Sequence, residues 1–184
     1  LSALRAERLQ LAALYPGAPP ARADRAAALA GLEQAYFAAA WIAYAQGFAQ
    51  IAAASREYGF GTGLATVARV WRAGCIIRAD LLNEIAAAYE RQPQLAHLLL
   101  DEHLAQMVTA AQAGWRGVVR TAAELGIPLL AVAAALGYFD ALRSDRLPAN
   151  LIQAQRDYFG AHTYHRIDRE GVFHSNWMVG GEAL

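Results

Sequence analysis

The sequence has no net charge and only one cysteine, and each of these scarcities excludes a class of protein. Its 184 residues carry 16 basic and 16 acidic side chains, whereas a nucleic-acid-binding protein needs a clustered basic face to neutralise phosphates. We therefore expect no nucleic-acid partner, while small anions remain candidate ligands. The single cysteine, Cys75, cannot form an internal disulfide, so the sequence predicts a reducing, cytoplasmic setting. Because Cys75 lies in an apolar run, a small buried core residue is favoured over a reactive thiol.

A signal peptide and a membrane span are also missing. Leu1 is not an initiator methionine, and the first ten residues, LSALRAERLQ, are typical of a helix, so we expect the chain to start inside a longer protein. The uncharged stretch Ala35–Ala54 is about as long as a bilayer span. Roughly half of it is alanine and Gln46, Gly47 and Gln50 interrupt it, which favours a buried helix and no membrane partner.

The remaining pattern is helical almost throughout, and no pair of strands is convincing. Glycine, proline and the apolar spacing place the ends of the expected helices. Five helices are predicted after the break Pro16–Pro20: from Asp24 or Ala27 to Tyr58, stopped by Gly59; Val67–Glu90, with Gly74 as a point of close backbone approach; Leu95–Leu125, either continuous or broken near Asp101, ending at Gly126; Leu129–Ser144; and from Pro148 to a stop at Gly160.

The sequence therefore predicts an all-α protein with a helical domain over residues 1–160 and an extended C-terminal arm over residues 161–184. It contains no G-x-G-x-x-G between a strand and a helix, so no dinucleotide-binding half is expected in this chain. The segment Gly59–Gly63, GFGTG, could suggest a phosphate loop, but it lies between two helices and has no Lys-Ser/Thr after it. A helix connector is the favoured interpretation.

Isolated cationic groups on apolar elements are the candidate site residues. Arg78 lies in an apolar surrounding, where a buried guanidinium must be paired; it would bind either an internal acid, such as Asp80 or Glu84, or a carboxylate or phosphate ligand. Arg156 raises the same question on the last helix. His162, just beyond it, can hydrogen-bond an anion in either protonation state.

The histidines do not form a recognisable metal site. His162 and His165 make an H-x-x-H pair without a third ligand at a familiar spacing, so solvated side chains are favoured. His97 and His103 are six residues apart and do not face one metal from one helix. No metal is expected.

Three motifs carry a resemblance to a known family. The segments YAQGF (Tyr44–Phe48), WRAGCIIRADLL (Trp71–Leu82) and LPANLIQAQRDYFGAHTYHRIDREGVFHSNW (Leu147–Trp177) resemble, in order, the C-terminal half of 6-phosphogluconate dehydrogenases. The resemblance covers nearly the whole chain and is weakest over Ala12–Arg25. It implies a helical domain preceded by a Rossmann domain for NADP, and a C-terminal arm that reaches into the partner subunit of a homodimer.

The resemblance also assigns roles. It implies that Arg78, Arg156 and His162 bind the phosphate of 6-phosphogluconate, and that the catalytic lysine and glutamate and the NADP site precede Leu1. The family oxidises and decarboxylates 6-phosphogluconate to ribulose 5-phosphate in the pentose phosphate pathway, without a required metal. The 184-residue chain alone is expected to be inactive because it has neither catalytic nor cofactor-binding residues. The alternative is a non-catalytic helical dimerisation module whose site residues are relics.

Overall fold

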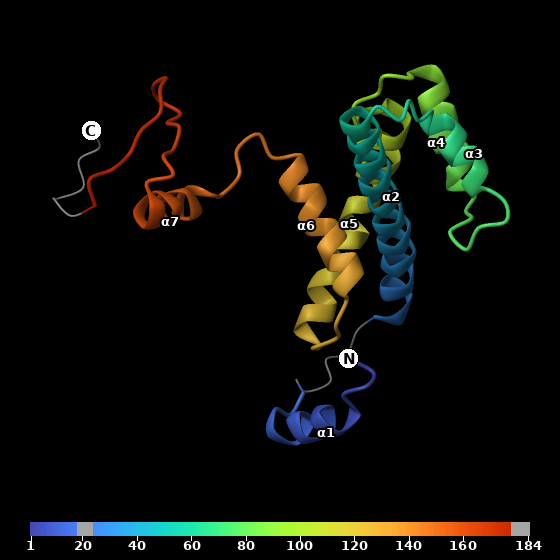
Figure 1. Ribbon diagram of the computed structural model, residues 1–184. Helices are drawn as coiled ribbons and strands as arrows, with labels where there is room; N and C mark the ends of the chain where they lie inside the picture. Colours follow the sequence, from blue (N-terminus) through green and yellow to red (C-terminus); the bar gives the residue numbers. More distant parts are fainter. Residues whose placement is uncertain (18–23, 178–184) are drawn as a thin grey trace. The chain divides into compact units, whose positions relative to one another are not determined.

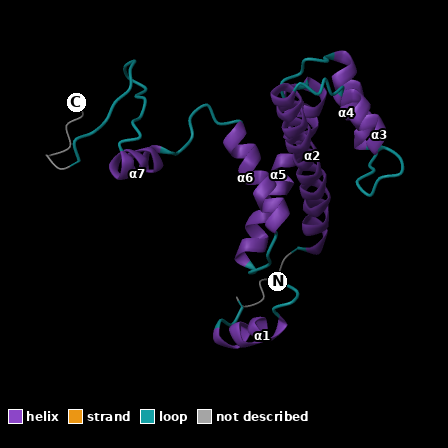
Figure 2. Cartoon of the chain, in the orientation of Figure 1, coloured by secondary structure: helices purple, strands orange, loops and turns teal. Residues whose placement is uncertain are grey.

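The computed structural model describes residues 1–17 and 24–177, and the described residues are helical with no strand (Figure 2). The predicted all-α class is confirmed. Part of the proline-rich break (residues 18–23) and the end of the predicted arm (residues 178–184) lie outside the described residues. The elements in order are α1 (Arg5–Leu14), α2 (Arg25–Tyr58), α3 (Leu64–Trp71), α4 (Leu81–Arg91), the 3-10 turn η1 (Leu98–Leu100), α5 (Glu102–Glu124), α6 (Leu130–Leu142) and α7 (Asn150–Gly160).

The chain divides into two compact units, Leu1–Asp140 and Ala141–Leu184. The first unit contains the hydrophobic core. The second contains the end of α6, all of α7 and the segment after it. The domain boundary predicted at Gly160 stays a prediction.

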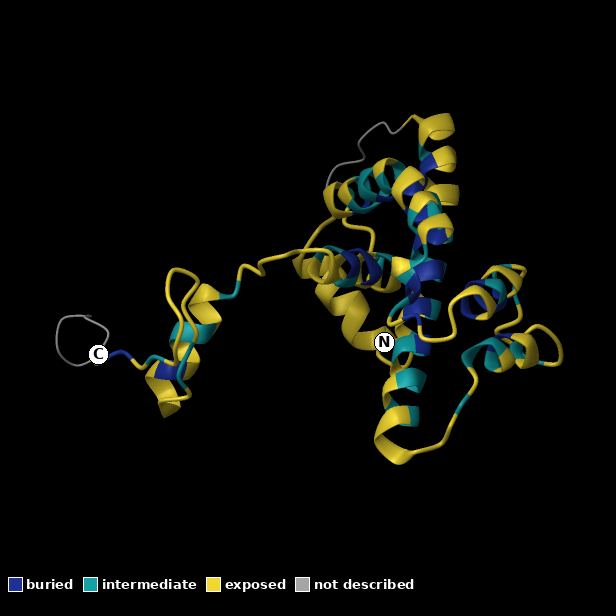
Figure 3. Ribbon diagram, turned by 90° about the horizontal axis from the view of Figure 1, so that it is seen from above, coloured by how far each residue is buried: buried dark blue, intermediate teal, exposed yellow. Residues whose placement is uncertain are grey.

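Helix α2 forms the centre of the core in the first unit because its buried residues recur at helical spacing. Ala35, Ala38, Ile42, Ala45 and Phe48 are each at most 1% exposed, and the spacing of three or four residues places them on one face. Small side chains on this face let α5 run along α2 at close range (Figure 1). Figure 3 shows that buried residues alternate with exposed ones along the helices of this unit.

Two glycines mark the closest approach of α2 and α5. A Cβ at Gly31 would lie 3.0 Å from Val118 Cγ2 and 3.4 Å from the carbonyl oxygen of Gly114. A Cβ at Gly114 would meet the Gln34 side chain at 2.0 to 3.1 Å, and the Gln34 Oε1 accepts a hydrogen bond from the Gly114 N–H at 3.1 Å. Absence of a side chain at both positions therefore sets the distance between the helices.

We expect Gly114→Ala to destabilise the fold, whereas Gly117→Ala on the same helix should not. Both substitutions gain the same helix propensity, about 1 kcal/mol. Only the first one crowds Gln34, whose Cβ at 3.1 Å cannot swing away and whose amide would lose its hydrogen bond to the Gly114 N–H, at a cost of roughly 1–3 kcal/mol. Nothing lies within 4 Å of a Cβ at Gly117. Urea unfolding followed by circular dichroism measures the difference. Equal stabilities for the two variants would contradict this account of the crossing.

Most helix ends lie where the sequence predicts them. Gly59 and Gly126 follow α2 and α5 with φ of 67° each, the left-handed conformation that ends helices. The expected helix Leu95–Leu125 is broken at Asp101, whose carboxylate accepts from the Leu104 N–H at 3.1 Å and caps α5. The segment Gly59–Gly63 is a connector between α2 and α3, as favoured.

The single helix predicted over Val67–Glu90 is wrong. Residues 72–80 form a loop between α3 and α4. Gly74 has φ +73°, which a right-handed helix cannot continue through, and a Cβ there would meet nothing within 4 Å. The glycine therefore serves a turn and not a close approach. Cys75, in the same loop, is a half-buried free thiol outside the core, contrary to the favoured interpretation.

In the part of the chain that the structure describes, no helix is both long and apolar enough to cross a membrane. The stretch Ala35–Ala54 belongs to α2, where it supplies much of the core face. The interpretation of this stretch as a buried helix is confirmed.

Candidate anion-binding site

Arg156 lies on the exposed side of α7, which begins two residues after Pro148, as predicted. Its Nη1 donates to Gln153 Oε1 at 3.3 Å, a contact with a neutral group one turn earlier. The charge of the guanidinium is therefore not neutralised by this contact. Gly160 comes four residues later, on the same face of the helix.

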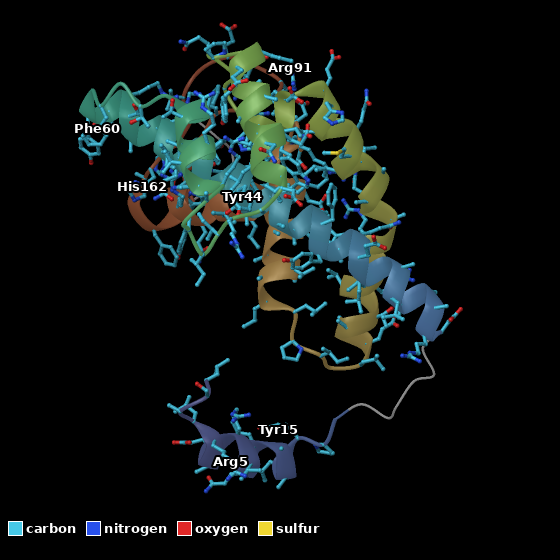
Figure 4. All side chains as sticks on the ribbon, turned by 90° about the vertical axis from the view of Figure 1, so that its right-hand side faces the viewer. Arg5, Tyr15, Tyr44, Phe60, Arg91 and His162 are labelled. Carbon is cyan, nitrogen blue, oxygen red and sulfur yellow. The ribbon has the colours of Figure 1, made fainter. Side chains whose placement is uncertain are left out.

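His162 follows the end of α7 (Figure 4). Its ring lies against Gly160. A Cβ at Gly160 would lie 2.7 Å from the His162 Nε2 and 2.9 Å from its Cδ2. Because Arg156 and Gly160 share one face of α7, the imidazole lies at the C-terminal end of the face that carries the guanidinium. The structure thus brings two of the three predicted site residues to one end of one helix.

Asp157, next to Arg156, joins α7 to the segment that follows. Its carboxylate is fully buried and accepts four hydrogen bonds: from the Thr163 N–H at 3.1 Å, and from the His174 Nδ1, the Ser175 N–H and the Trp177 Nε1 at 2.9 Å each. Four is the full acceptor capacity of a carboxylate. The segment after Gly160 therefore folds against α7 through this one side chain.

The described part of the predicted arm is consequently not simply extended. Tyr164 and Phe173 exchange two backbone hydrogen bonds of 2.9 Å and form an isolated antiparallel bridge. The guanidiniums of Arg166 and Arg169 lie over the Phe173 ring, 5.8 and 4.6 Å from its centroid. The sequence did not predict this hairpin because the stretch has no periodicity. The hairpin is held by a few contacts between its two halves and not by a repeated apolar pattern.

Hydrogen bonding controls the ionisation of Asp157. Burial by itself raises the pKa of the carboxyl, but the donors from Ser175, His174 and Trp177 outweigh it and lower the pKa from 3.8 to about 2. The folded state therefore favours the charged form. The linked stabilisation is present above pH 3.8 and is lost as the pH falls toward 2.

We expect the indole N–H resonance of Trp177 to report this loss. Between pH 3.8 and about 2 the Trp177 Nε1–H should leave its carboxylate partner and shift toward the value of a solvated indole. Two-dimensional ¹H–¹⁵N NMR over this range measures the change. In Asp157→Asn the resonance should already be shifted at neutral pH. A Trp177 resonance that is insensitive to both changes would contradict the role of Asp157.

Arg78 lies in the loop 72–80 of the first unit, and its side chain is exposed. The expectation of a buried guanidinium is wrong. Among the described residues it forms no ion pair with Asp80 or Glu84, and Glu84 instead lies 3.6 Å from His103. The loop is tied to α2 by the Tyr44 hydroxyl, which donates to the carbonyl of Ile77, the residue before Arg78 (Figure 4). Burial, followed by the nearby Cys75, raises the pKa of Tyr44.

The other histidines have structural partners. The His97 Nε2 lies 3.1 Å from the Tyr138 hydroxyl, and burial lowers the pKa of this ring. The His165 Nδ1 lies 2.9 Å from the Gly171 carbonyl oxygen, to which it donates. Within residues 1–17 and 24–177 no group of three His, Cys, Asp or Glu side chains could hold a metal.

A cavity of about 550 Å³ in the second unit does not involve the candidate residues. It is lined by Arg146, Asn150, Gln153, Ala154, Tyr164, His165, Arg166, Ile167, Asp168, Ser175 and Trp177. Neither Arg156 nor His162 borders it. Both residues are exposed on the surface of the second unit.

Sequence reasoning missed Asp157 and Tyr44. An acid in the last turn of a helix is disfavoured by the helix dipole, and this conflict was the available signal that Asp157 has specific partners. Tyr44 gave no comparable signal, because tyrosines on helices are usual in cores and its acceptor is a backbone carbonyl 33 positions away.

Comparison with known proteins identifies extensive similarity. The family model of the 6-phosphogluconate dehydrogenase C-terminal domain matches residues 1–177. The chain is 48% identical over 180 residues to a decarboxylating 6-phosphogluconate dehydrogenase of Synechococcus elongatus and 43% identical over 180 residues to the NADP(+)-dependent enzyme of Bacillus subtilis. In both cases the match covers 97% of this chain and 38% of the relative.

A solved structure agrees with these sequences. The 6-phosphogluconate dehydrogenase of Plasmodium falciparum, described in its apo form, with NADP+ and with its substrate 6-phosphogluconate, superposes with a TM-score of 0.88 at 36% identity. The match covers 96% of this chain and 38% of that one. The chain therefore spans about 38% of the length of the relatives that it matches.

Proposed function

Since this chain belongs to the 6-phosphogluconate dehydrogenase C-terminal domain family, we propose that it forms the substrate-binding and dimerisation part of an NADP-dependent decarboxylating enzyme. The complete enzyme would convert 6-phosphogluconate to ribulose 5-phosphate and CO₂. The observation that carries the proposal is the pair Arg156 and His162 at one end of α7, inside the motif QRDYFGAH that resembles the family.

The chemistry of the pair fits a phosphate. Phosphate carries up to two negative charges and several acceptor oxygens, and a guanidinium can bind two of these oxygens with parallel charge-assisted hydrogen bonds. The His162 imidazole adds at least one donor. These groups hold the substrate by its phosphate end and thereby position its carbon chain, but they take no part in breaking bonds.

We propose Arg78 as a third phosphate ligand, as the resemblance implies. Its exposed position, without an acidic partner among the described residues, leaves the guanidinium available for an anion. It belongs to the first unit, and Arg156 and His162 belong to the second. The assignment of Arg78 therefore depends on the motif alone.

The described helices do not fit the cofactor. A dinucleotide is held by a strand, a glycine-rich turn and a helix, and the described residues contain no such unit. We propose that NADP is bound by a part of the complete enzyme that corresponds to the remaining length of the relatives. This chain would hold the substrate in position for reaction with the bound NADP.

We also propose a homodimer in which residues 161–184 act as the arm that reaches the partner subunit, and a cytoplasmic location. Arg156 and His162 are exposed and do not line the 550 Å³ cavity of their own unit, which supports the first point. The single cysteine supports the second.

Calorimetry of the complete protein tests the proposal. We expect it to bind 6-phosphogluconate and to bind gluconate, which has no phosphate, far more weakly. A non-catalytic dimerisation module would bind neither compound. Equal affinities for 6-phosphogluconate and gluconate would contradict the proposed phosphate site. Arg120→Ala, which changes an exposed helical arginine whose Nε lies 3.9 Å from Glu124, is the matched control and should bind like the wild type.

A further inference from the structure

The turn after α7 adopts backbone conformations that side-chain-bearing residues rarely occupy. Ala161 and Thr163, which flank His162, have φ of 48° and 62°. Such conformations persist only where the surrounding structure holds them, and they concentrate at functional sites. Ala161 is the C-cap of α7, and its N–H donates to the Asp157 carbonyl oxygen. Thr163 is not glycine either, and a side-chain contact holds its backbone.

Asp157 supplies that interaction. Its Oδ1 accepts from the Thr163 N–H at 3.1 Å, which ties the peptide immediately after His162 back to α7. The same oxygen accepts from the His174 Nδ1, and Oδ2 accepts from the Ser175 N–H and the Trp177 Nε1. The turn, the end of the hairpin and the helix thus share one fully buried carboxylate.

Gly160 supplies the space for the ring. It is the last residue of α7 and does not have a positive φ, so the backbone does not require glycine at this position. A Cβ there would overlap the imidazole, at 2.7 Å from Nε2 and 2.9 Å from Cδ2. The ring is the movable end of a side chain, so alanine at this position would displace the imidazole and leave the fold intact.

We propose that Asp157 and Gly160 are positioning residues, which hold the His162 imidazole beside Arg156 so that both reach the same phosphate. The inference rests on the proposed function, because it assigns these residues a role in substrate binding. Asp157 fixes the backbone on which His162 stands, and Gly160 fixes where its ring can lie. Neither residue needs to touch the substrate.

Gly160→Ala in the complete dehydrogenase is the decisive variant. We expect the KM for 6-phosphogluconate to rise roughly tenfold, which corresponds to one misplaced charge-assisted hydrogen bond, with kcat and the melting temperature unchanged. The control is Gly137→Ala on α6, another helical glycine, where a Cβ would meet nothing within 4 Å. It should leave KM, kcat and melting temperature as in the wild type.

A double-mutant cycle with His162→Ala separates positioning from general structural damage. If Gly160 acts through His162, Gly160→Ala should change KM by less than about twofold once the imidazole is absent. Asp157→Asn is expected to raise KM in the same way and to lose its effect in the His162→Ala background. Should Asp157→Asn not fold, the Gly160→Ala cycle decides the question alone.

The outcomes distinguish two failures. If His162→Ala alone leaves KM unchanged, His162 is not a phosphate ligand. Both the proposed phosphate site and the positioning role of Asp157 and Gly160 are then wrong. If His162→Ala raises KM but Gly160→Ala does not, or if the two effects add in full, the phosphate site stands and the positioning role is wrong.

Discussion

Replacing Arg156 by alanine in the complete dehydrogenase is expected to lower kcat/KM for 6-phosphogluconate by about 30- to 1000-fold. This factor corresponds to a loss of binding free energy on the order of 2–4 kcal/mol. The guanidinium is exposed in this chain and its polar contact within it is the neutral Gln153 amide. Its charge is therefore available to a phosphate, and removing it leaves the anion without its bidentate partner. Steady-state kinetics of the purified variant measure the loss.

The dependence on phosphate makes this test specific. With gluconate as substrate, Arg156→Ala should have little effect, because the group that the arginine binds is absent. The exposed helical arginine Arg120 is the matched control, and Arg120→Ala should remain within about twofold of the wild type. A similar loss with both substrates would show that Arg156 supports the fold and not the phosphate.

Arg78→Ala belongs in the same series because the motif WRAGCIIRADLL alone assigns Arg78 to the phosphate. A phosphate-dependent rise in KM would add it to the site. If KM and turnover were unchanged for both substrates, Arg78 would not be a phosphate ligand. Arg156 and His162 would then remain as the anchor.

Mixed dimers are expected to recover activity from two inactive chains, because we propose that Arg156 and the arm that follows it serve the partner subunit. One chain would carry lesions at the catalytic acid and base that the family places before this region, with Arg156 intact. The other would have an intact catalytic part and Arg156→Ala. Each homodimer should be inactive or strongly impaired. After co-refolding, the mixed dimer should contain one site that combines an intact catalytic part with Arg156 and the arm of the opposite chain.

The reciprocal arrangement gives the opposite result. If both lesions lie on one chain and the partner is wild type, exchange of arms leaves no complete site, and the mixed dimer should be inactive. An arm that serves its own subunit predicts activity in this second dimer and none in the first. Differently tagged chains that purify together establish that the mixed species has formed. Activity confined to the second dimer would overturn the exchange.

Local physics made much of the fold predictable from the sequence. The stops at Gly59 and Gly126 and the cap at Asp101 depend on the backbone conformation or side-chain reach of single residues, so composition and spacing locate them. The core face of α2 follows from the 3.6-residue period. Arg156 and His162 were found because their motif resembles a family, and motif identity needs no coordinates.

The tertiary structure alone decided what the polar groups contact. The position of Asp157 in the last turn of α7 signals a specific partner, but it does not tell which groups bind the carboxylate. The hydrogen bonds from Thr163, His174, Ser175 and Trp177 join positions 6 to 20 residues apart. The exposure of Arg78 likewise depends on a loop where the apolar pattern predicts a helix. Periodicity and propensity report the conformation of a segment, whereas burial and hydrogen-bond partners are set by where segments distant in sequence come together.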